Sequence, residues 1–311
     1  MTPALRRLGH STLYGPHGLR SGWRLLMWSQ ALTLFTLPLY LGAAMLPALS
    51  VPISTFVLLA ISAATTLPAL AATFAMVRSV DGGGLGDVGL GGPASRVALN
   101  LTVGLGIGVG MIAAILGGLV VAGYAEVSWR GAGVVDLAVW LGLLALAASW
   151  EELAFRGYAF QWLVRGLGRA GATAVFALSF AALHLFNPNI DAVGFVSIAG
   201  ASVLLSVALF RSDDLWLPIG LHWGWNLAQG LLFGIPISGL SGDEVPSLCT
   251  THLTGPDLIT GGAFGFEGSV MALVAMALGI AALVLIPLAG RPSLQMDGGL
   301  PKRVGGQPAG G

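Results

Sequence analysis

Long apolar runs alternate with short polar segments along most of the chain. A run of about 20 consecutive apolar residues is long enough to cross the hydrocarbon core of a bilayer as an α-helix. Because such runs recur, the pattern predicts an all-α polytopic membrane protein with about eight transmembrane helices. The predicted spans are 25–46, 53–77, 97–122, 135–156, 171–187, 192–210, 215–235 and 269–289.

The segments between and beside the runs suggest four regions. Residues 1–24 are polar and Arg-containing, and the long run that follows lacks the short core and small-residue cleavage site of a signal peptide. We therefore expect 1–24 to be a retained cytoplasmic segment, followed by the first three spans over 25–134. Residues 135–290 contain the remaining spans and the chemistry described below. The Gly/Pro-rich tail 291–311 is predicted to be disordered.

Basic residues are distributed unevenly on the two sides of the predicted spans. With a cytoplasmic N-terminus, twelve Arg and Lys residues fall inside, Arg130 falls outside and Arg156 lies at the end of a span. Loops rich in Arg and Lys remain in the cytoplasm. The predicted topology is therefore N-in and C-in, which also agrees with an even number of spans.

The composition limits the classes of function. Hydrophobic residues make up 55% of the 311 positions and charged residues 9%, against roughly 25% charged in an ordinary soluble domain. The net charge is zero and no basic patch is present, so a nucleic-acid partner is not expected. Cys249 is the only cysteine, which excludes a disulfide within the chain and a multi-cysteine metal site. The 47 glycines suit close helix packing in lipid.

Ionisable side chains inside apolar spans are costly in lipid and usually functional. They occur in three of the predicted spans, as Glu151, Glu152 and Arg156 in 135–156, His184 in 171–187, and His222 in 215–235. We expect these side chains to converge between the three helices and to form a site.

Helical spacing sorts these residues into pairs. Glu152 and Arg156 are four positions apart, with the acid first, which favours an ion pair on one helix face. Glu151 points about 100° away from that face and has no local partner. His222 and Asn226 are again four positions apart, and Phe180 lies one turn before His184, where it would wall the pocket.

This set of residues suits two kinds of chemistry. Glu151, His184 and His222 could bind Zn²⁺ with a water in the open position. Alternatively, Glu151 and His184 could activate a water directly while His222 and Asn226 stabilise the developing oxyanion. Both lead to attack of water on an acyl carbon, and the sequence does not separate them. Two other classes also remain open, namely a proton- or ion-coupled transporter and a non-catalytic membrane scaffold.

At these residues the sequence resembles the CPBP family of intramembrane proteases, which includes CAAX prenyl proteases and bacteriocin-processing enzymes. The family's three motifs EExxxR, FxxxH and HxxxN begin here at Glu151, Phe180 and His222, in the family's order. The segment 260–269 also looks like bacterial members, and the resemblance covers about residues 135–290. It implies an integral protein of a bacterial cytoplasmic membrane that cleaves a membrane-embedded peptide or protein, prenylated or bacteriocin-related.

The resemblance also implies a role for each matching residue. Glu151 would be the catalytic glutamate, with His184 as its partner on the water. His222 and Asn226 would bind the oxyanion, with Glu152, Arg156 and Phe180 in support. In a zinc-dependent version, Glu151, His184 and His222 would be the ligands. We favour the glutamate-activated water, because two histidines, one glutamate and an amide form a less common zinc set than that of HExxH enzymes.

Overall fold

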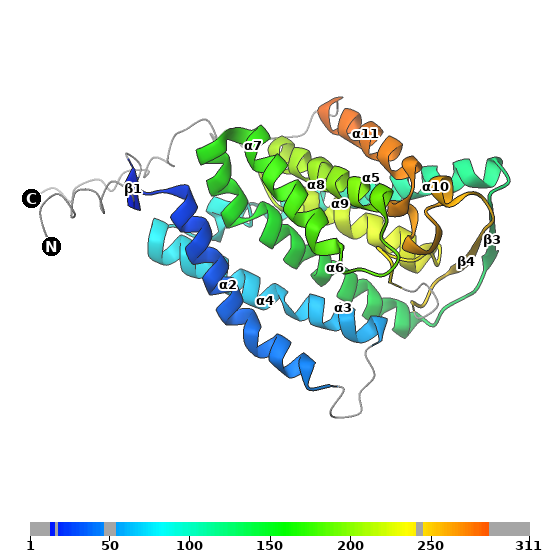
Figure 1. Ribbon diagram of the computed structural model, residues 1–311, viewed down its shortest axis with the longest axis horizontal. Coiled ribbons are helices and arrows are strands. Elements are labelled where there is room, and N and C mark those ends of the chain that lie inside the picture. Colours follow the sequence, from blue (N-terminus) through cyan, green and yellow to red (C-terminus); the bar gives the residue numbers. More distant parts are fainter. Residues whose placement is uncertain (1–12, 16–17, 47–53, 241–244, 286–311) are drawn as a thin grey trace, which may run out of the picture.

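The computed structural model describes residues 13–15, 18–46, 54–240 and 245–285. Most of the helices run along the long axis of the molecule (Figure 1). A small antiparallel sheet of β3 (Ala125–Trp129) and β4 (Cys249–Leu253) lies at one end, and β1 (Tyr14–Gly15) pairs with β2 (Gly18–Leu19) at the other. The predicted C-terminal tail and much of the predicted N-terminal segment lie outside the described residues.

Each predicted apolar run contains at least one helix. The helices are α2 (Ser21–Ala44), α3 (Thr55–Ala64), α4 (Thr66–Met76), α5 (Ala94–Val121), α6 (Val134–Arg156), α7 (Tyr158–His184), α8 (Ala192–Ser212), α9 (Trp216–Asn226), α10 (Asp257–Thr260) and α11 (Val270–Leu285). Within the described residues, five helical stretches are long and apolar enough to cross a membrane, and one of them, Val134–His184, contains both α6 and α7. The predicted number of eight spans is therefore not confirmed, whereas the mostly helical class is.

The boundaries differ from the predicted ones where the chain turns sharply. The predicted span 53–77 consists of α3 and α4, which meet at Thr65. The segment after Arg156 is helical from Tyr158 onward and bends at Gly168, whose φ of 73° is left-handed. Gly157 alone separates α6 from α7, with a non-helical ψ of −137°. A Cβ there would lie 2.2 Å from the Leu153 carbonyl oxygen, so the position requires glycine.

Two connections between helices form short strands that the hydropathy pattern did not predict. Residues 125–129 and 249–253 form the β3–β4 pair, with Val127 opposite Thr251. Burial alternates along β4 over only five residues, which is too short a pattern to predict a strand from the sequence. The two strands pair because their connections meet at one end of the bundle.

Helices α5 and α9 pack against each other through glycines. A Cβ on Gly220 or Gly224 would lie 2.3 or 2.4 Å from the carbonyl oxygens of Leu101 and Leu105. Gly104 and Gly108 of α5 face the α9 backbone in the same way, at 2.3 Å. Small residues allow such backbone contact between membrane helices. This contact fixes α9, which contains His222 and Asn226.

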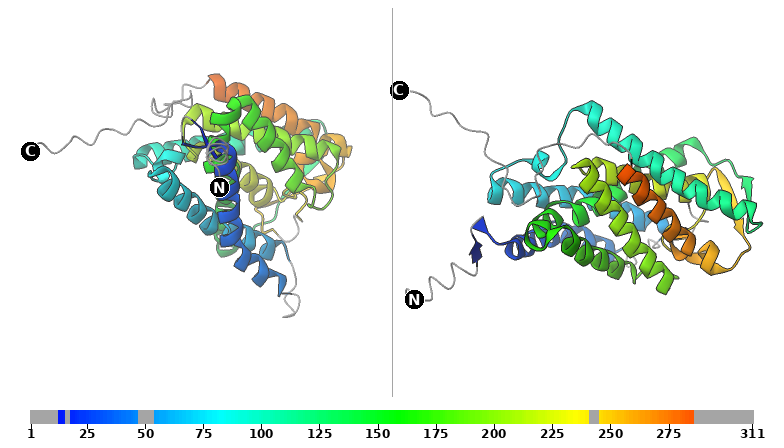
Figure 2. Two further views of the ribbon diagram at one scale, coloured as in Figure 1. Left: turned by 60° about the vertical axis from the view of Figure 1, so that its left-hand side comes forward. Right: turned by 90° about the horizontal axis from the view of Figure 1, so that it is seen from above.

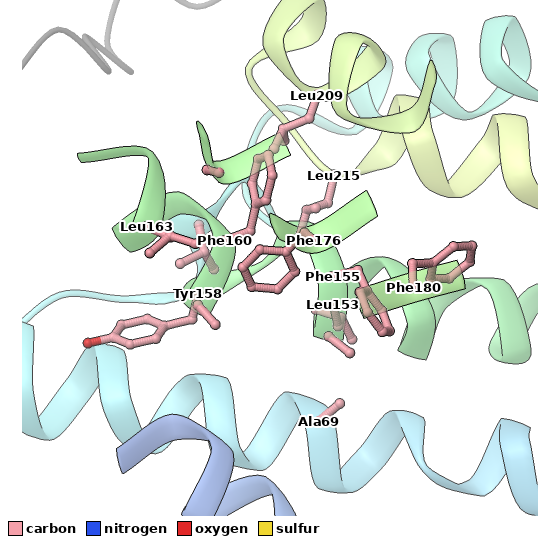
Figure 3. Close-up of a cluster of buried hydrophobic side chains, with 14 of the residues drawn as sticks. Ala69, Leu153, Phe155, Tyr158, Phe160, Leu163, Phe176, Phe180, Leu209 and Leu215 are labelled. Atoms are coloured by element: carbon pink, nitrogen blue, oxygen red, sulfur yellow. The ribbon is translucent and has the colours of Figure 1, made fainter. Parts of the chain in front are cut away.

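The main buried cluster lies where α6, α7 and α8 meet (Figure 3). Phe155 makes edge-to-face contacts with Phe176 and Phe180, at ring-centroid distances of 6.2 and 4.9 Å. Phe160 packs on Phe176 at 5.4 Å. Such aromatic pairs add to the stabilisation from burial, and here they set the position of α7 against the end of α6.

Helix α2 lies at the periphery of the bundle and packs on α4 and α7 (Figure 2). Its polar anchor is Arg24, which is 4% exposed and forms an ion pair with Asp81. Arg24 also donates to the Tyr158 hydroxyl at 3.1 Å and lies 3.6 Å from the ring centroid of Trp162. This buried guanidinium therefore adds polar contacts to the packing of α2 on its neighbours.

Candidate active site

Helix α6 presents two adjacent glutamates to different surroundings. The Glu151 side chain is 20% exposed and lines a cavity, whereas that of Glu152 is fully buried. Beside them, the Trp150 indole donates to the Ser62 hydroxyl of α3 at 2.6 Å. The helical period predicted this divergence of Glu151 and Glu152, because successive residues on a helix point in different directions.

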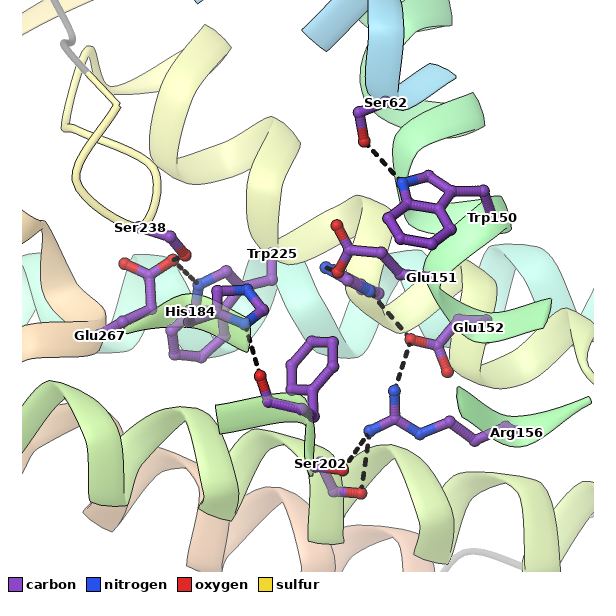
Figure 4. A network of polar contacts seen from close by, with 12 residues as sticks. Ser62, Trp150, Glu151, Glu152, Arg156, His184, Ser202, Trp225, Ser238 and Glu267 are labelled. Atoms are coloured by element: carbon purple, nitrogen blue, oxygen red, sulfur yellow. Dashed lines mark hydrogen bonds and ion pairs between the residues drawn. The ribbon is translucent and has the colours of Figure 1, made fainter. Parts of the chain in front are cut away.

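The predicted ion pair between Glu152 and Arg156 is present and completely buried. Arg156 Nη1 lies 3.2 Å from Glu152 Oε1. The other end of the guanidinium donates from Nη2 to the Ser202 hydroxyl and carbonyl of α8, at 2.7 and 3.1 Å. Sequence reasoning missed this role of Ser202. The guanidinium thus connects α6 to α8 directly below the site (Figure 4).

The His222 ring lies between the two glutamates. Its Nδ1 is 2.9 Å from Glu152 Oε1, and its Nε2 is 3.7 Å from Glu151 Oε2. Since a carboxylate paired with an arginine only accepts hydrogen bonds, Nδ1 carries a proton and donates to Glu152. The opposite ring nitrogen, Nε2, faces Glu151.

His184 ends α7 and is oriented by its own helix. Its Nδ1 lies 2.8 Å from the Phe180 carbonyl oxygen, which can only accept, so Nδ1 is the donor. In the neutral ring Nε2 is then free to accept a proton. The Phe180 ring lies 4.5 Å from that of His184 and meets His222 edge-on at 6.5 Å, while Arg156 lies 5.0 Å from its centroid. Phe180 therefore walls the site, as predicted.

One cavity brings the predicted residues together. Its lining includes Glu151, His184, His222 and Asn226, together with Phe180, Trp150 and Ser238. Among the described residues, the Asn226 carboxamide has no hydrogen-bond partner. Asn226 therefore offers a free amide to a bound molecule. Glu152 and Arg156 do not line the cavity and act on it through His222 and Phe180.

A second, smaller and more apolar pocket adjoins the same residues. It shares Phe180, His184, His222, Asn226 and Ser238 with the larger cavity. It also includes Glu267 from the short helix η6 (Phe266–Gly268), a residue that sequence reasoning did not assign to the site. The only available signal was the segment 260–269, in which Glu267 stands among glycines and phenylalanines.

The predicted zinc ligands do not form a metal-binding group in this arrangement. Within the described residues, no set of three His, Cys, Asp or Glu side chains is placed to hold a metal ion. His222 uses Nδ1 to bind Glu152, so only its Nε2 faces Glu151. Binding of Zn²⁺ by these residues stays a prediction from the sequence.

The comparison with protein families identifies this part of the chain. Residues 133–228 match the family model described as Rce1-like, type II CAAX prenyl endopeptidase. The matched segment contains all three motifs and ends before Ser238 and Glu267. No curated protein and no solved structure matches the chain.

Proposed function

We propose that the protein hydrolyses a peptide bond of a membrane-associated substrate through a water activated by Glu151 and His184. The match of residues 133–228 to the Rce1-like, type II CAAX prenyl endopeptidase model supports this proposal. The observation that carries the proposal is the convergence of Glu151, His184, His222 and Asn226 around one cavity. These residues come from three helices, and they include an acceptor for a proton and donors for an oxyanion.

Two proton acceptors, the Glu151 carboxylate and His184 Nε2, would activate the water. Glu151 is the cavity's carboxylate, because Glu152 is engaged by Arg156 and His222. His184 holds its proton on Nδ1 toward Phe180, which leaves Nε2 as a second acceptor facing the cavity. A water between the two groups would lose a proton to Glu151 as its oxygen attacks the carbonyl carbon.

Stabilisation of the tetrahedral intermediate falls to His222 and Asn226. Asn226 contributes a carboxamide N–H that has no competing partner among the described residues. His222 donates from Nε2 when its ring is an imidazolium, whose charge Glu152 offsets through Nδ1. Donors already aimed at the oxyanion need no rearrangement during the reaction.

Collapse of the intermediate breaks the C–N bond. The proton taken up by Glu151 passes to the leaving nitrogen, which departs as an amine, and the carbonyl carbon keeps the oxygen of the water. The sum is the addition of one water molecule across the peptide bond, with both catalytic groups returned to their starting state.

The substrate and location in this proposal follow the family. A prenylated C-terminal peptide of the CAAX type fits the matched family, and a bacteriocin-related peptide fits the wider resemblance. The apolar helices support an integral membrane protein, and we place it in a bacterial cytoplasmic membrane. The family match favours this function over the transporter and scaffold alternatives.

The experiment is cleavage of a prenylated CAAX-type peptide by purified protein reconstituted in lipid vesicles. Glu151→Gln removes the titratable oxygen and preserves side-chain shape, so we expect a folded protein without cleavage. Glu126→Gln, on exposed β3, is the matched control and should cleave normally. Full cleavage by Glu151→Gln would overturn the mechanism, and solute flux without any cleavage would favour a transporter.

Metal dependence is tested separately. The metal content of the purified protein is measured, and cleavage is compared with and without a chelator. Glutamate-activated water predicts cleavage that survives the chelator. Stoichiometric zinc that is absent from His184→Ala, together with loss of activity in the chelator, would replace it with a metallopeptidase mechanism.

A further inference from the structure

A polar cluster beside the catalytic cavity is centred on Glu267. This carboxylate is 3% exposed, and none of the described cationic side chains lies within ion-pair distance of it. It accepts instead from three neutral donors: Gln229 Nε2 at 2.5 Å, Trp225 Nε1 at 3.3 Å and Ser238 Oγ at 3.2 Å. Burial of a charge without an ion-pair partner is costly, and these three hydrogen bonds offset part of that cost.

Two of the donors flank Asn226 on its helix. Trp225 immediately precedes Asn226, and Gln229 follows it by three residues, in the π-helical turn η4 (Leu227–Leu232). The π-turns of helices occur frequently at functional sites. Because Glu267 accepts hydrogen bonds from both Trp225 and Gln229, it fixes the position of the helical turn that contains Asn226.

The third donor belongs to a turn that borders the cavity. Ser238 lies there in a left-handed conformation, with φ of 47°. Its carbonyl accepts from Asn187 Nδ2 at 2.9 Å, and the next residue, Gly239, donates to the Phe264 carbonyl at 2.8 Å. Gln229 Nε2 also donates to the Pro236 carbonyl. Glu267 and Gln229 therefore attach this turn to the Asn226 helix.

We propose that Glu267 is a positioning residue that acts through Asn226. Its carboxylate joins the Asn226 turn of α9 and η4 to the Ser238 turn, so that the carboxamide meets the substrate carbonyl in one fixed orientation. The inference rests on the proposed function, since it assumes that Asn226 stabilises the oxyanion. It adds a residue outside the matched segment 133–228 to the machinery of the site.

The test is a double-mutant cycle between Glu267 and Asn226. Glu267→Gln replaces one acceptor oxygen with a donor, and we expect kcat to fall roughly tenfold to a hundredfold, as for misplacement of a catalytic group. KM should change by less than about twofold, because the loss is confined to the transition state. In the Asn226→Ala background, the same substitution should lower kcat by less than about twofold. Single-turnover measurement with excess enzyme detects slow cleavage in the double variant.

Asp214→Asn provides the matched control. Asp214 is another buried carboxylate, 2% exposed, and it accepts from the Trp216 and Leu217 amides at the far end of α9. Its substitution should lower thermal stability while kcat per folded molecule is retained. If Glu267 only stabilised the fold, Glu267→Gln would lower thermal stability and retain kcat per folded molecule, as the control does. Its effect would also be the same with Asn226 present and in the Asn226→Ala background. That result, or an unchanged kcat in Glu267→Gln, would overturn the proposal.

Two further measurements keep the inference separate from the proposed function. Wild type and Glu151→Gln are assayed in parallel, so failure of both to cleave rejects the proposed function and the inference with it, whereas cleavage by wild type with unchanged kcat in Glu267→Gln rejects only the inference. If Glu267→Gln does not fold, Trp225→Phe removes a single donor to Glu267. It should then show the same fall in kcat and the same insensitivity in the Asn226→Ala background.

Discussion

At the scale of single residues, Glu151 and Glu152 illustrate how neighbouring carboxylates acquire different tasks. Glu152 binds Arg156 and His222 through Oε1, and its other oxygen, Oε2, is buried with no hydrogen-bond partner among the described residues. Glu151 keeps contact with the cavity, and its Oε2 lies 3.7 Å from His222 Nε2. The buried glutamate holds the ring in place, which leaves the partly exposed one free to exchange protons.

Removal of Arg156 should affect folding before it affects chemistry. Arg156→Ala leaves Glu152 buried without a cation, and breaking a buried ion pair in this way costs about 3–5 kcal/mol. We expect a lower yield of folded protein and a lower unfolding temperature in detergent. Arg169→Ala, at an exposed position, should change neither. Normal stability with lost cleavage would instead place Arg156 in the catalytic group.

Glu267 gives a pH-dependent contribution to stability. Burial raises the pKa of its carboxyl above the usual value for glutamate, although hydrogen bonds from Gln229, Trp225 and Ser238 oppose part of this increase. A raised pKa means that folding favours the protonated form, so its contribution is complete below the unfolded pKa of about 4.3 and is lost as pH rises through the folded pKa.

The measurement is the unfolding temperature of the purified protein as a function of pH. In wild type, the contribution of Glu267 should make stability decrease with rising pH above the ordinary glutamate range. Glu267→Gln does not titrate and should show a flatter curve over that interval. Identical curves would contradict the inferred pKa shift.

Sequence spacing predicted the residues whose partners are local. The ion pair of Glu152 with Arg156 and the ring contact of Phe180 with His184 both follow from one helical turn. Glu267 was not predicted, because its partners are 29 to 42 residues away and belong to different elements. A single glutamate in a glycine-rich loop contains no periodicity from which such contacts could be inferred.

At the scale of elements, the contact between α5 and α9 sets the position of half the site. Four glycines allow the two backbones to touch, and His222 lies between the two that belong to α9. The glycine content predicted close packing in general terms. The sequence could not show which glycines form the contact. Gly106 and Gly110 belong to the same helix, yet a Cβ at either would meet no described atom within 4 Å.

These glycines therefore make a matched pair of substitutions possible. Gly224→Ala would place a Cβ 2.4 Å from the Leu105 carbonyl oxygen, so the helices must separate, at a cost of about 1–3 kcal/mol or more. We expect lower thermal stability and weaker cleavage. Gly110→Ala meets nothing within 4 Å and should be neutral or stabilising. Equal effects of the two substitutions would contradict the assignment of this contact.

Other elements could not be predicted because they depend on conformation rather than on hydropathy. The break at Thr65 lies inside one predicted span, and the bend at Gly168 lies in a predicted connection that is helical from Tyr158 onward. Strands β3 and β4 are separated by more than 100 residues, and only the assembled bundle brings them together. Hydropathy identified the helical regions, whereas glycine and long-range pairing determined how the chain turns between them.

At the scale of the whole molecule, α5 separates two polar ends. Its 28 residues span about 42 Å, from the segment around η2 (Val77–Asp81) and η3 (Leu85–Val88) to the β3–β4 sheet. The distribution of arginine predicts that the first end is cytoplasmic and that the sheet is outside.

This orientation is testable with two isosteric substitutions in a Cys249→Ser background. Ser79→Cys, in η2, should react with a membrane-impermeant maleimide only after cells are permeabilised. Ser128→Cys, in β3, should react in intact cells, and both positions are exposed. The reverse pattern of labelling would contradict the predicted N-in and C-in topology.

The central claim is that water attacks the peptide bond directly, with Glu151 as the base. The most direct measurement is cleavage of the prenylated peptide in ¹⁸O-labelled water containing hydroxylamine, followed by mass spectrometry. The account predicts a single labelled oxygen in the new carboxyl group, no hydroxamate product, and neither cleavage nor label with Glu151→Gln. A hydroxamate, or a peptide covalently attached to the protein, would show an acyl-enzyme intermediate and contradict it.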